Sequence, residues 1–390
     1  MKRAFLFLAA LFFPFALFSQ IRAEYRPLAH MLATLPEREP TTGNLVELLH
    51  PGSELLLRLE EEIMAAGESV HAEYFIFSDD IVGNTIRTAL KHKAMDNLDV
   101  QFIGDGLGSR AAFFNRMKKS GVQVKHRPLI PLRPRNHQKL LLLDHSVGYA
   151  GGMNMSCSEF YDWVDFIVRL RGPVVTQLEQ LYARTWESHG GKTAEYGIPL
   201  PEHCDGGVTI QCVGDNPKKK ERLNLKAYLW VLENAREYFW AKSPYLKPPR
   251  EFIDALVDAA GRGVDIRLMT PWDKDDISCL EEPFERALYE ELVDAGVHIY
   301  IRPDRYDHSK VFVTDDYLCA TGSVNLDRLS LCSNFEYNLY FYDEGVALQM
   351  KSVIEDDFAN CYELTPEHIA AFPCWLKTFK NTLRTLGKLF

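Results

Sequence analysis

Two histidine–lysine pairs are the residues of this chain whose types and spacing best fit a chemical task. His137 and Lys139 lie two positions apart in the segment HQKLLLLD, and the segment HSKVFVTD repeats that spacing. Side chains alternate along a β-strand, so the two members of each pair share one face. A buried ammonium group costs free energy unless an anionic group meets it. Each pair therefore predicts either a carboxylate partner within the fold or an anionic ligand.

The two segments remain in register well beyond these pairs. The positions that they share, counted from each histidine, are the histidine itself (His137 and His308), lysine at +2 (Lys139 and Lys310), aspartate at +7 (Asp144 and Asp315), glycine at +14 (Gly151 and Gly322), asparagine at +17 (Asn154 and Asn325) and a carboxylate at +28 (Asp165 and Glu336). A register of this length indicates that the chain contains an internal duplication.

Strand-like and helix-like stretches alternate before each segment. A helical stretch at about 83–95 lies between VHAEYFIF (70–77) and VQFIGDG (100–106), and VDIRLMTP (264–271) lies between helical stretches at 250–262 and 281–295. This alternation is typical of βαβ units. We therefore expect an α/β protein of two homologous halves, each a mixed, mainly parallel sheet flanked by helices, with one active site between them. The expected domains are residues 45–190 and 208–365, joined by a Gly- and Pro-rich segment near 188–207.

A pocket built from both segments would suit a phosphodiester. Lys139 and Lys310 would neutralise the non-bridging oxygens, and Asn154 and Asn325 would donate hydrogen bonds to them. One neutral imidazole can attack phosphorus, while the other, protonated, gives its proton to the departing alkoxide. The near symmetry of the two segments leaves open which histidine attacks. Because the lysines supply the positive charge, we expect no metal and no other cofactor.

The four shared carboxylates are expected to serve two different purposes. Asp165 and Glu336 could each accept the second ring N–H of a histidine, which fixes the tautomer of the ring and stabilises its cation. Asp144 and Asp315 lie at an odd offset from their histidines, so on a continuous strand they would face away from them. Since both follow a strand and precede expected hairpin turns, we interpret them as braces for those turns.

The shared glycines fit the same hairpins. Folding each hairpin about its turn sets Gly151 opposite Lys139 and Gly322 opposite Lys310. A residue without a side chain at that position would leave room for the lysine and a phosphate.

The composition is that of an ordinary globular protein with an acidic balance. The chain has 390 residues, of which 44 are basic and 54 acidic, giving a net charge of -10. This balance weighs against broad nucleic-acid binding, for which a basic face is expected. The eight cysteines show no metal-ligand spacing, and Cys204 and Cys212 are the best candidates for a disulfide; for most of the eight, small buried apolar residues are the simpler interpretation.

Residues 1–23 have the pattern of a signal peptide or a membrane anchor. Lys2 and Arg3 precede an uncharged, mostly apolar run that is short for a membrane span. We therefore expect an exported protein of the cell envelope, either membrane-associated or periplasmic.

Two further segments are candidates for lipid contact. The tail CWLKTFKNTLRTLGKLF (374–390) has apolar residues at helical spacing with basic residues between them, and we expect a basic amphipathic helix over 366–390. Such a helix can lie on an anionic bilayer, or it can dock on its own protein with its lysines facing water. The loop PLIPLRP (128–134) places Leu129, Ile130 and Leu132 just before the first motif, where they could touch acyl chains or be buried.

The paired motifs resemble those of the phospholipase D superfamily, and within it those of bacterial cardiolipin synthases. RNHQKLLLLDHSVGYAGGMN (135–154) and ATGSVNLDRLSLCSNFEYNL (320–339) are similar to the two motif regions of that family, and the resemblance runs from about residue 50 to the C-terminus. It implies a phosphatidyl-histidine intermediate. The phosphatidyl group would come from one phosphatidylglycerol and pass to the hydroxyl of a second. Carried over by position, the implied catalytic residues are His137, Lys139, Asn154, His308, Lys310 and Asn325, together with Asp144 and Asp315 of the family motif.

The resemblance leaves alternatives for the acceptor and the substrate. The usual family pattern has two membrane helices before the first half, whereas this chain has one short apolar segment. A phospholipase D-type hydrolase that passes the phosphatidyl group to water would need the same site, and only acceptor binding and water exclusion separate the two. A nucleic-acid phosphodiesterase is a further alternative, which the acidic balance and the amphipathic tail disfavour. The expected partners are therefore phosphatidylglycerol and a membrane surface, and no nucleic acid.

Overall fold

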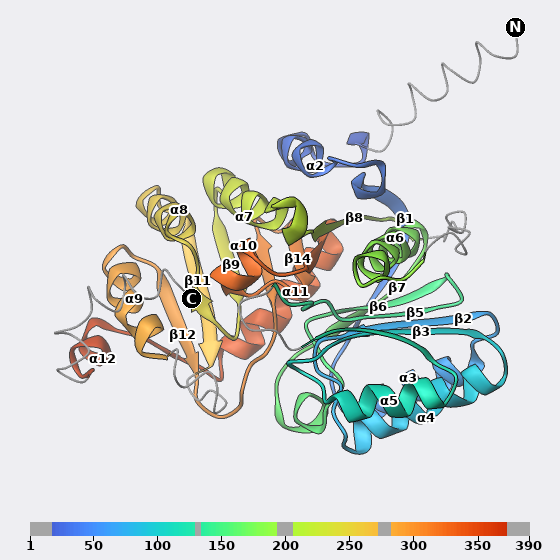
Figure 1. The fold of residues 1–390 in the computed structure, drawn as a ribbon. Coiled ribbons are helices and arrows are strands. Elements are labelled where there is room, and N and C mark those ends of the chain that lie inside the picture. The colour runs from blue at the N-terminus through green and yellow to red at the C-terminus, as the bar shows by residue number, and fades with distance from the viewer. Residues whose placement is uncertain (1–17, 129–133, 193–205, 272–281, 373–390) are drawn as a thin grey trace, which may run out of the picture.

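The computed structural model describes residues 18–128, 134–192, 206–271 and 282–372, which form two halves that share a common order of elements, with additional short elements in the second (Figure 1). The first half contains β1 (Thr41–Leu49), α3 (Ser53–Ala65), β2 (Ser69–Tyr74), α4 (Ile81–Met95), β3 (Asp99–Asp105), α5 (Ala111–Lys119), β4 (Gln123–Arg127), β5 (Leu140–Leu143), β6 (Val147–Gly151), β7 (Ile167–Arg171) and α6 (Pro173–Ser188). The second contains β8 (Val208–Asp215), α7 (Leu223–Asn234), β9 (Tyr238–Lys242), β10 (Leu246–Lys247), α8 (Arg250–Gly261), β11 (Asp265–Pro271), α9 (Glu282–Asp294), β12 (His298–Arg302), β13 (Val311–Thr314), β14 (Leu318–Gly322), β15 (Leu326–Asp327), α10 (Arg328–Cys332), β16 (Glu336–Tyr342), α11 (Glu344–Phe358), β17 (Tyr362–Glu363) and α12 (Pro366–Ala370).

Within the described residues, one sheet of 15 strands runs through both halves in the order β17-β12-β11-β9-β13-β14-β16-β8-β1-β7-β6-β5-β2-β3-β4. The halves meet where β1 pairs antiparallel with β8, and the strand order on one side of this junction repeats on the other. The predicted α/β class, with two homologous halves and a mixed sheet, is confirmed.

The predicted predominance of parallel pairing is wrong. Parallel pairs occur between β2, β3 and β4, between β9, β11 and β12, and in the short pair β10–β15. The hairpins β5–β6 and β13–β14 and the strands β7 and β16 that follow them are all antiparallel to their neighbours. Hairpins bring antiparallel strands together through short turns, so each half has a small parallel core extended by an antiparallel meander.

Three apolar clusters hold the layers together. Helices α3, α4 and α5 pack on the sheet of the first half, and α7, α8 and α9 pack on that of the second. The third cluster combines Leu178 of α6, Met350 of α11 and Trp240 of β9, so it contains residues of both halves. Because apolar burial is roughly proportional to the area removed from water, this shared cluster fixes the two halves relative to each other.

The described N-terminal residues pack on the second half. Phe18 and Ile21, within the segment expected to be a leader, are buried in the cluster that contains α7 and α8. Arg22 holds this segment in place. Its backbone N–H donates to the Tyr317 hydroxyl over 3.0 Å, and its side chain forms an ion pair with Glu344. The short helix α2 (Arg26–Leu32) follows. Residues 1–17 of the expected leader lie outside the described residues, and no helix within the described ranges is long and apolar enough to cross a membrane.

Candidate active site

Each histidine–lysine pair directly precedes the first strand of a tight hairpin. Asp144 and His145 at the β5–β6 turn have φ of 47° and 55°, and Asp315 and Asp316 at the β13–β14 turn have φ of 49° and 51°. Two consecutive residues in the left-handed region are what a two-residue hairpin turn requires, and aspartate tolerates that region better than most residues.

Asp144 and Asp315 hold these turns against the preceding strand. The Asp144 carboxylate accepts backbone N–H groups of Gly67, Glu68 and Ser69 over 2.9, 2.8 and 2.9 Å. The Asp315 carboxylate does the same for three consecutive residues at the start of β9, over 3.0, 2.9 and 3.2 Å. Both carboxylates therefore lie at the end of the hairpin that is remote from its histidine.

The register of the hairpins continues to the expected lysine–glycine pairs, but the glycines have another reason to be there. Leu140 pairs with Ala150, which sets Lys139 opposite Gly151. A Cβ on Gly151 would meet the Phe166 carbonyl oxygen at 3.2 Å rather than the lysine. The glycine that makes room for a lysine is Gly152, where a Cβ would lie 2.5 Å from Cδ of Lys310 in the opposite half.

The two halves exchange backbone segments around the histidines. The His137 N–H donates to the Phe335 carbonyl over 3.1 Å, just before Glu336. The His308 N–H donates to the Val164 carbonyl over 2.8 Å, just before Asp165. Each histidine is thereby brought beside the carboxylate of the other half.

His137 is oriented by the second half. Its Nδ1 lies 3.0 and 3.1 Å from the two carboxylate oxygens of Glu336 and 3.0 Å from the carbonyl oxygen of Ser323. All three of these oxygen atoms are acceptors. The Ser323 hydroxyl donates to Glu336 over 2.5 Å. The neutral ring therefore carries its proton on Nδ1, and the lone pair is on Nε2.

His308 is oriented by two carboxylates of the first half. Its Nδ1 lies 3.0 Å from Oδ2 of Asp165 and 3.1 Å from Oε2 of Glu159. Glu159 was not among the residues expected from the sequence. It is buried on a short helical turn, Ser158–Asp162, and the position that corresponds to it in the second half is Ser330. A search based on the duplication therefore could not find it, and burial is the signal that separates it from the exposed Asp162 three residues later.

The asparagines of the two halves are not equivalent. The Asn154 side chain accepts the Ile76 N–H over 3.0 Å and donates to Oε1 of Glu159 over 2.5 Å, so it also helps to position that carboxylate. Oδ1 of Asn325 is buried and has no hydrogen-bond partner among the described residues.

The lysines are buried among charges of both halves. Lys139 and Lys310 are each 2% exposed, and their ammonium groups donate to the carbonyl oxygens of His137 and His308 respectively. Burial lowers the pKa of Lys139 to about 7, assisted by the positive charge of Lys310 and opposed by Glu336 and Glu159. Burial lowers the pKa of Lys310 to about 8, opposed by the site carboxylates. An anion that entered the site would stabilise both charged forms.

The histidine environments also differ electrostatically. Burial lowers the pKa of His137 to about 4, against the opposing effect of Glu336, and the nearby lysines lower it further. Burial alone would raise the pKa of Glu159, but His308 and Lys310 outweigh it and hold that pKa at about 2. At neutral pH the site therefore contains a neutral His137 and an ionised Glu159 that faces His308.

A second set of contacts supports the residue before each histidine, with different chemistry in each half. Asn136 donates to Oε1 of Glu73 over 2.7 Å. Asp307 instead pairs with Lys242, whose ammonium lies 2.7 Å from Oδ2 and also pairs with Asp357. These buried contacts fix the backbone on which the histidines stand.

Several expectations fall on parts of the chain that the structure does not describe. These are Leu129, Ile130 and Leu132 of the loop before the first motif, residues 373–390 of the tail, and Cys204 of the candidate disulfide. Cys212, the expected disulfide partner of Cys204, is buried in β8.

Together these residues form a buried cluster in which two oriented imidazoles, two ammonium groups and three carboxylates belong to both halves. The interaction of Lys139 with Lys310, and of both lysines with Glu159, Asp165 and Glu336, places these charges in one site. Such a site can bind a phosphate diester, attack it with an imidazole and protonate the leaving group.

Comparisons with known proteins identify the family of the chain. The family model described as "Cardiolipin synthase, PLD-like domain" matches residues 59–186 and again 228–358, one match in each half. The chain is 29% identical over 386 residues to a cardiolipin synthase of Listeria monocytogenes, covering 93% of this chain and 79% of the relative. It is 30% identical over 382 residues to cardiolipin synthase 1 of Staphylococcus epidermidis, covering 93% and 77%.

A solved structure shares the fold at low sequence identity. The crystal structure of phosphatidylserine synthase from Haemophilus influenzae superposes with a TM-score of 0.71 at 12% identity, covering 94% of this chain and 100% of that chain. The paired matches in the two halves and the length of the alignments identify the family. The chain belongs to the phospholipase D superfamily, in its cardiolipin synthase-like branch, and is an enzyme of the phosphatidyltransferase type.

Proposed function

We propose that the protein makes cardiolipin by transferring a phosphatidyl group from one phosphatidylglycerol to another through a phosphohistidine intermediate. The observation that carries this proposal is the reciprocal pairing of His137 with Glu336 and of His308 with Asp165, each across the two halves. The relatives named above are cardiolipin synthases, which supports the choice of donor and acceptor.

His137 is the nucleophile in this proposal. Its Nδ1 proton is directed at Glu336 and Ser323, so Nε2 presents a lone pair. A pKa of about 4 keeps the ring neutral at physiological pH. The Nε2 lone pair forms a bond to phosphorus while the bond from phosphorus to the glycerol oxygen breaks.

His308 is the acid and then the base. Two carboxylates at its Nδ1 stabilise the imidazolium form, which can give its Nε2 proton to the departing glycerol oxygen. The neutral ring then accepts the proton of the hydroxyl of a second phosphatidylglycerol. That oxygen attacks phosphorus, the phosphorus–nitrogen bond breaks, and His137 is restored.

Lys139, Lys310, Asn154 and Asn325 serve the phosphoryl oxygens. The two buried ammonium groups lie where they can neutralise the phosphate, and their lowered pKa values mean that they bind an anion with uptake of protons. An asparagine contacts a phosphoryl oxygen through its amide N–H, and Asn154 already donates its amide to Glu159, so we assign this role mainly to Asn325. Asp144 and Asp315, which the family motif includes, are assigned the support of the hairpin turns instead of a chemical step.

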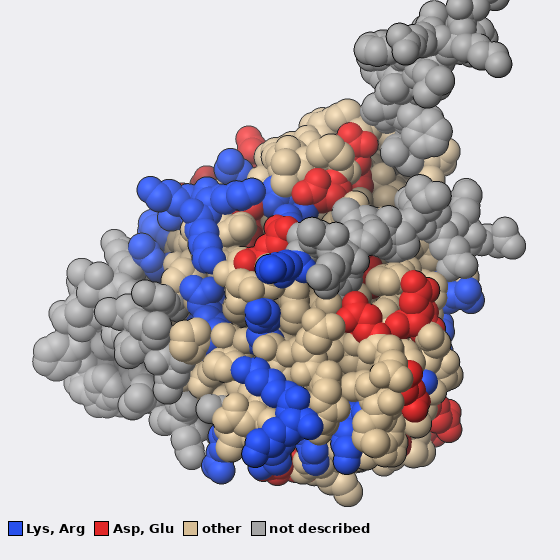
Figure 2. Space-filling view, turned by 45° about the vertical axis from the view of Figure 1, so that its right-hand side comes forward, with Lys and Arg blue, Asp and Glu red and all other residues tan. Residues whose placement is uncertain are grey.

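The substrate also requires that the enzyme reach an anionic lipid surface. Lysine and arginine side chains gather in a band along the face seen in Figure 2, although the chain as a whole carries a net charge of -10. Lys125 of the first half and Lys218 of the second donate to neighbouring carbonyl groups, of Gly190 and Ser188, so basic residues of both halves adjoin. Basic side chains on one face favour contact with anionic phospholipids. We propose a location at the membrane surface of the cell envelope; export itself remains a prediction from residues 1–23.

The proposed function is tested by incubating the purified protein with phosphatidylglycerol vesicles and identifying the products. We expect cardiolipin and glycerol, with no turnover by His137→Ala or His308→Ala and normal turnover by the control His298→Ala, whose ring is exposed and pairs with Glu363. Phosphatidic acid and glycerol as the only products would replace this proposal with the hydrolase. Unchanged lipid with an intact, folded protein would reject both.

A further inference from the structure

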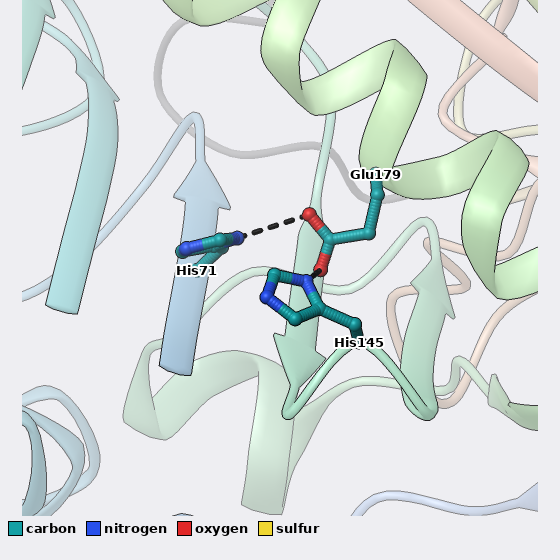
Figure 3. A group of neighbouring side chains, drawn as sticks. All are labelled: His71, His145 and Glu179. Carbon is teal, nitrogen blue, oxygen red and sulfur yellow. Dashed lines mark hydrogen bonds and ion pairs between the residues drawn. The ribbon is translucent and has the colours of Figure 1, made fainter. Parts of the chain in front are cut away.

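A second cluster of histidine and carboxylate side chains lies in the first half, away from the active site. His71 of β2, His145 of the β5–β6 turn and Glu179 of α6 point toward one another (Figure 3). His145 lies at the turn of the hairpin whose other end carries His137, and β5 between them spans about 13 Å. The cluster therefore has no part in the phosphoryl chemistry described above.

The donor atoms of these residues converge. Nδ1 of His71 lies 3.0 Å from Oε2 of Glu179, and Nδ1 of His145 lies 3.0 Å from Oε1 of the same carboxylate. One donor atom from each residue lies within 4.8 Å of the others. Neighbouring ligands of a tetrahedral zinc ion are about 3.3 Å apart, given bonds of about 2.0–2.1 Å, so the two histidine–carboxylate distances are already close to ligand spacing.

The far side of each ring also has a partner. Nε2 of His71 lies 3.5 Å from Oδ2 of Asp99, and Nε2 of His145 lies 3.2 Å from the Ser69 hydroxyl. Metal-binding histidines commonly donate their other ring N–H to a carboxylate or another acceptor, which fixes the tautomer and the ring orientation. Tyr182 of α6 stacks on the His71 ring at 5.1 Å with an interplanar angle of 11° and holds it further.

His145 is the most exposed of the three side chains. The side chains of His71 and Glu179 are 0% and 4% exposed, whereas that of His145 is 15% exposed. An ion can therefore enter beside His145 at the turn, and a water molecule can complete the coordination there.

The second half shows how the same place is held without metal ligands. The strand pairing that sets His71 beside Leu142 sets Trp240 beside Val313, and Asp316 takes the place of His145. There the link from the turn to the helix is an ion pair of 2.7 Å between Asp316 and Lys351 of α11. In the second half, this ammonium–carboxylate pair is sufficient to connect the turn to its helix. In the first half, the corresponding position holds two imidazoles and a carboxylate instead.

We propose that His71, His145 and Glu179 bind a divalent transition-metal ion of the zinc type, which ties the β5–β6 turn to α6. Imidazole and carboxylate are suitable ligands for such an ion, and the three donors come from three separate elements that the ion would join. Binding would displace the protons that the rings direct at Glu179. The ion would have a structural role, because the catalytic residues lie beyond the other end of the hairpin.

Zinc binding to the full-length protein tests the proposal. After treatment with a chelator and its removal, the protein is titrated with Zn²⁺ alone, and bound zinc and the melting temperature are measured. We expect about one zinc ion per chain and a higher melting temperature in zinc. His145→Asn should weaken zinc binding more than tenfold. Asp99→Asn, which changes the partner of His71 Nε2 and leaves the three proposed ligands in place, should weaken it about 10–100-fold.

Two control variants exclude other zinc sites. His308→Asn removes the histidine of the only other described group of possible ligands, Glu159, Asp165 and His308, and should leave the tight binding unchanged. His298→Asn removes an exposed histidine that pairs with one carboxylate and should also have no effect.

A third variant tests whether the effect of zinc depends on the metal ligands, in a protein whose turn is still connected to α6 by an ion pair. The double variant His145→Asp with Glu179→Lys installs the pair found in the second half, and it should fold and keep its catalytic activity while its melting temperature no longer responds to zinc. Equal zinc retention in wild type and His145→Asn, or a wild-type melting temperature that does not change with zinc, would overturn the proposal. The turn and α6 would then be connected only by the hydrogen bonds of the two histidines to Glu179.

Discussion

His137 and His308 each direct Nδ1 at a carboxylate that belongs to the opposite half of the chain. The sequence repeat predicted the residue types of this arrangement but not the exchange, because two copies of one motif do not say which carboxylate meets which ring. Nor could the repeat reveal Glu159, since its counterpart Ser330 has no acid. The asymmetry that distinguishes the two histidines therefore became visible only with the contacts.

Glu159→Gln tests the assignment of His308 as the proton donor. The variant keeps an acceptor for Asn154 but removes one of the two negative charges at His308 Nδ1. We expect kcat to fall about 10–100-fold with a smaller change in KM, since general acid catalysis contributes about 10²–10⁴-fold. The exposed Glu363→Gln is the control, and an unchanged kcat in Glu159→Gln would show that this carboxylate does not act through His308.

The buried lysines predict a basic limb in the pH profile. Lys139 and Lys310 have pKa values lowered to about 7 and about 8, so the free enzyme loses positive charge as pH rises through this range. We expect kcat/KM to decline from about pH 7 upward, whereas kcat should decline later, because bound phosphate holds both lysines protonated. Steady-state rates measured from pH 5 to about pH 9 would check this, and parallel profiles for kcat and kcat/KM would contradict it.

At the scale of the elements, two hairpins set the positions of the catalytic pairs. The expected strands and helices were found, including α4, α8 and α9 close to the predicted ranges, because each has a distinct apolar pattern. The prediction of a mainly parallel sheet is wrong. Helices between the first strands of each half indicate parallel pairing, but the hairpins that follow add antiparallel strands. The odd offset of Asp144 from His137 pointed correctly to a position away from the ring.

Asp144→Ala and Asp315→Ala test whether these aspartates support the fold or the chemistry. Each carboxylate accepts three backbone N–H groups. Their loss should lower the free energy of unfolding by about 1–3 kcal/mol, which chemical denaturation can measure. At a temperature where the variants are folded, the rate of the chemical step should stay within a few-fold of wild type. The exposed Asp356→Ala should change neither property, and a loss of activity in a fully folded Asp144 variant would return that residue to the catalytic site.

At the scale of the whole molecule, the two halves form one continuous sheet and one catalytic site. A tyrosine of the second half joins them directly: the Tyr337 hydroxyl donates to the Lys139 carbonyl over 2.8 Å and accepts the Gly151 N–H over 2.8 Å. The duplication predicted two similar halves with a shared site, but the shared apolar cluster of α6 and α11 depends on packing that no sequence pattern specifies. A single catalytic site of this kind requires that both histidines act on one phosphorus atom.

The most direct test of that claim uses a phosphatidyl ester of p-nitrophenol, whose leaving group departs without being protonated. His308→Asn should release a burst of p-nitrophenolate, because His137 still attacks, and should then stall with the phosphatidyl group bound to His137, because no base activates the acceptor. His137→Asn should give no burst. Mass spectrometry of peptides from enzyme quenched in base would locate the modification. A burst in His137→Asn, or a turnover by His308→Asn that matches wild type, would contradict a shared site with these two roles.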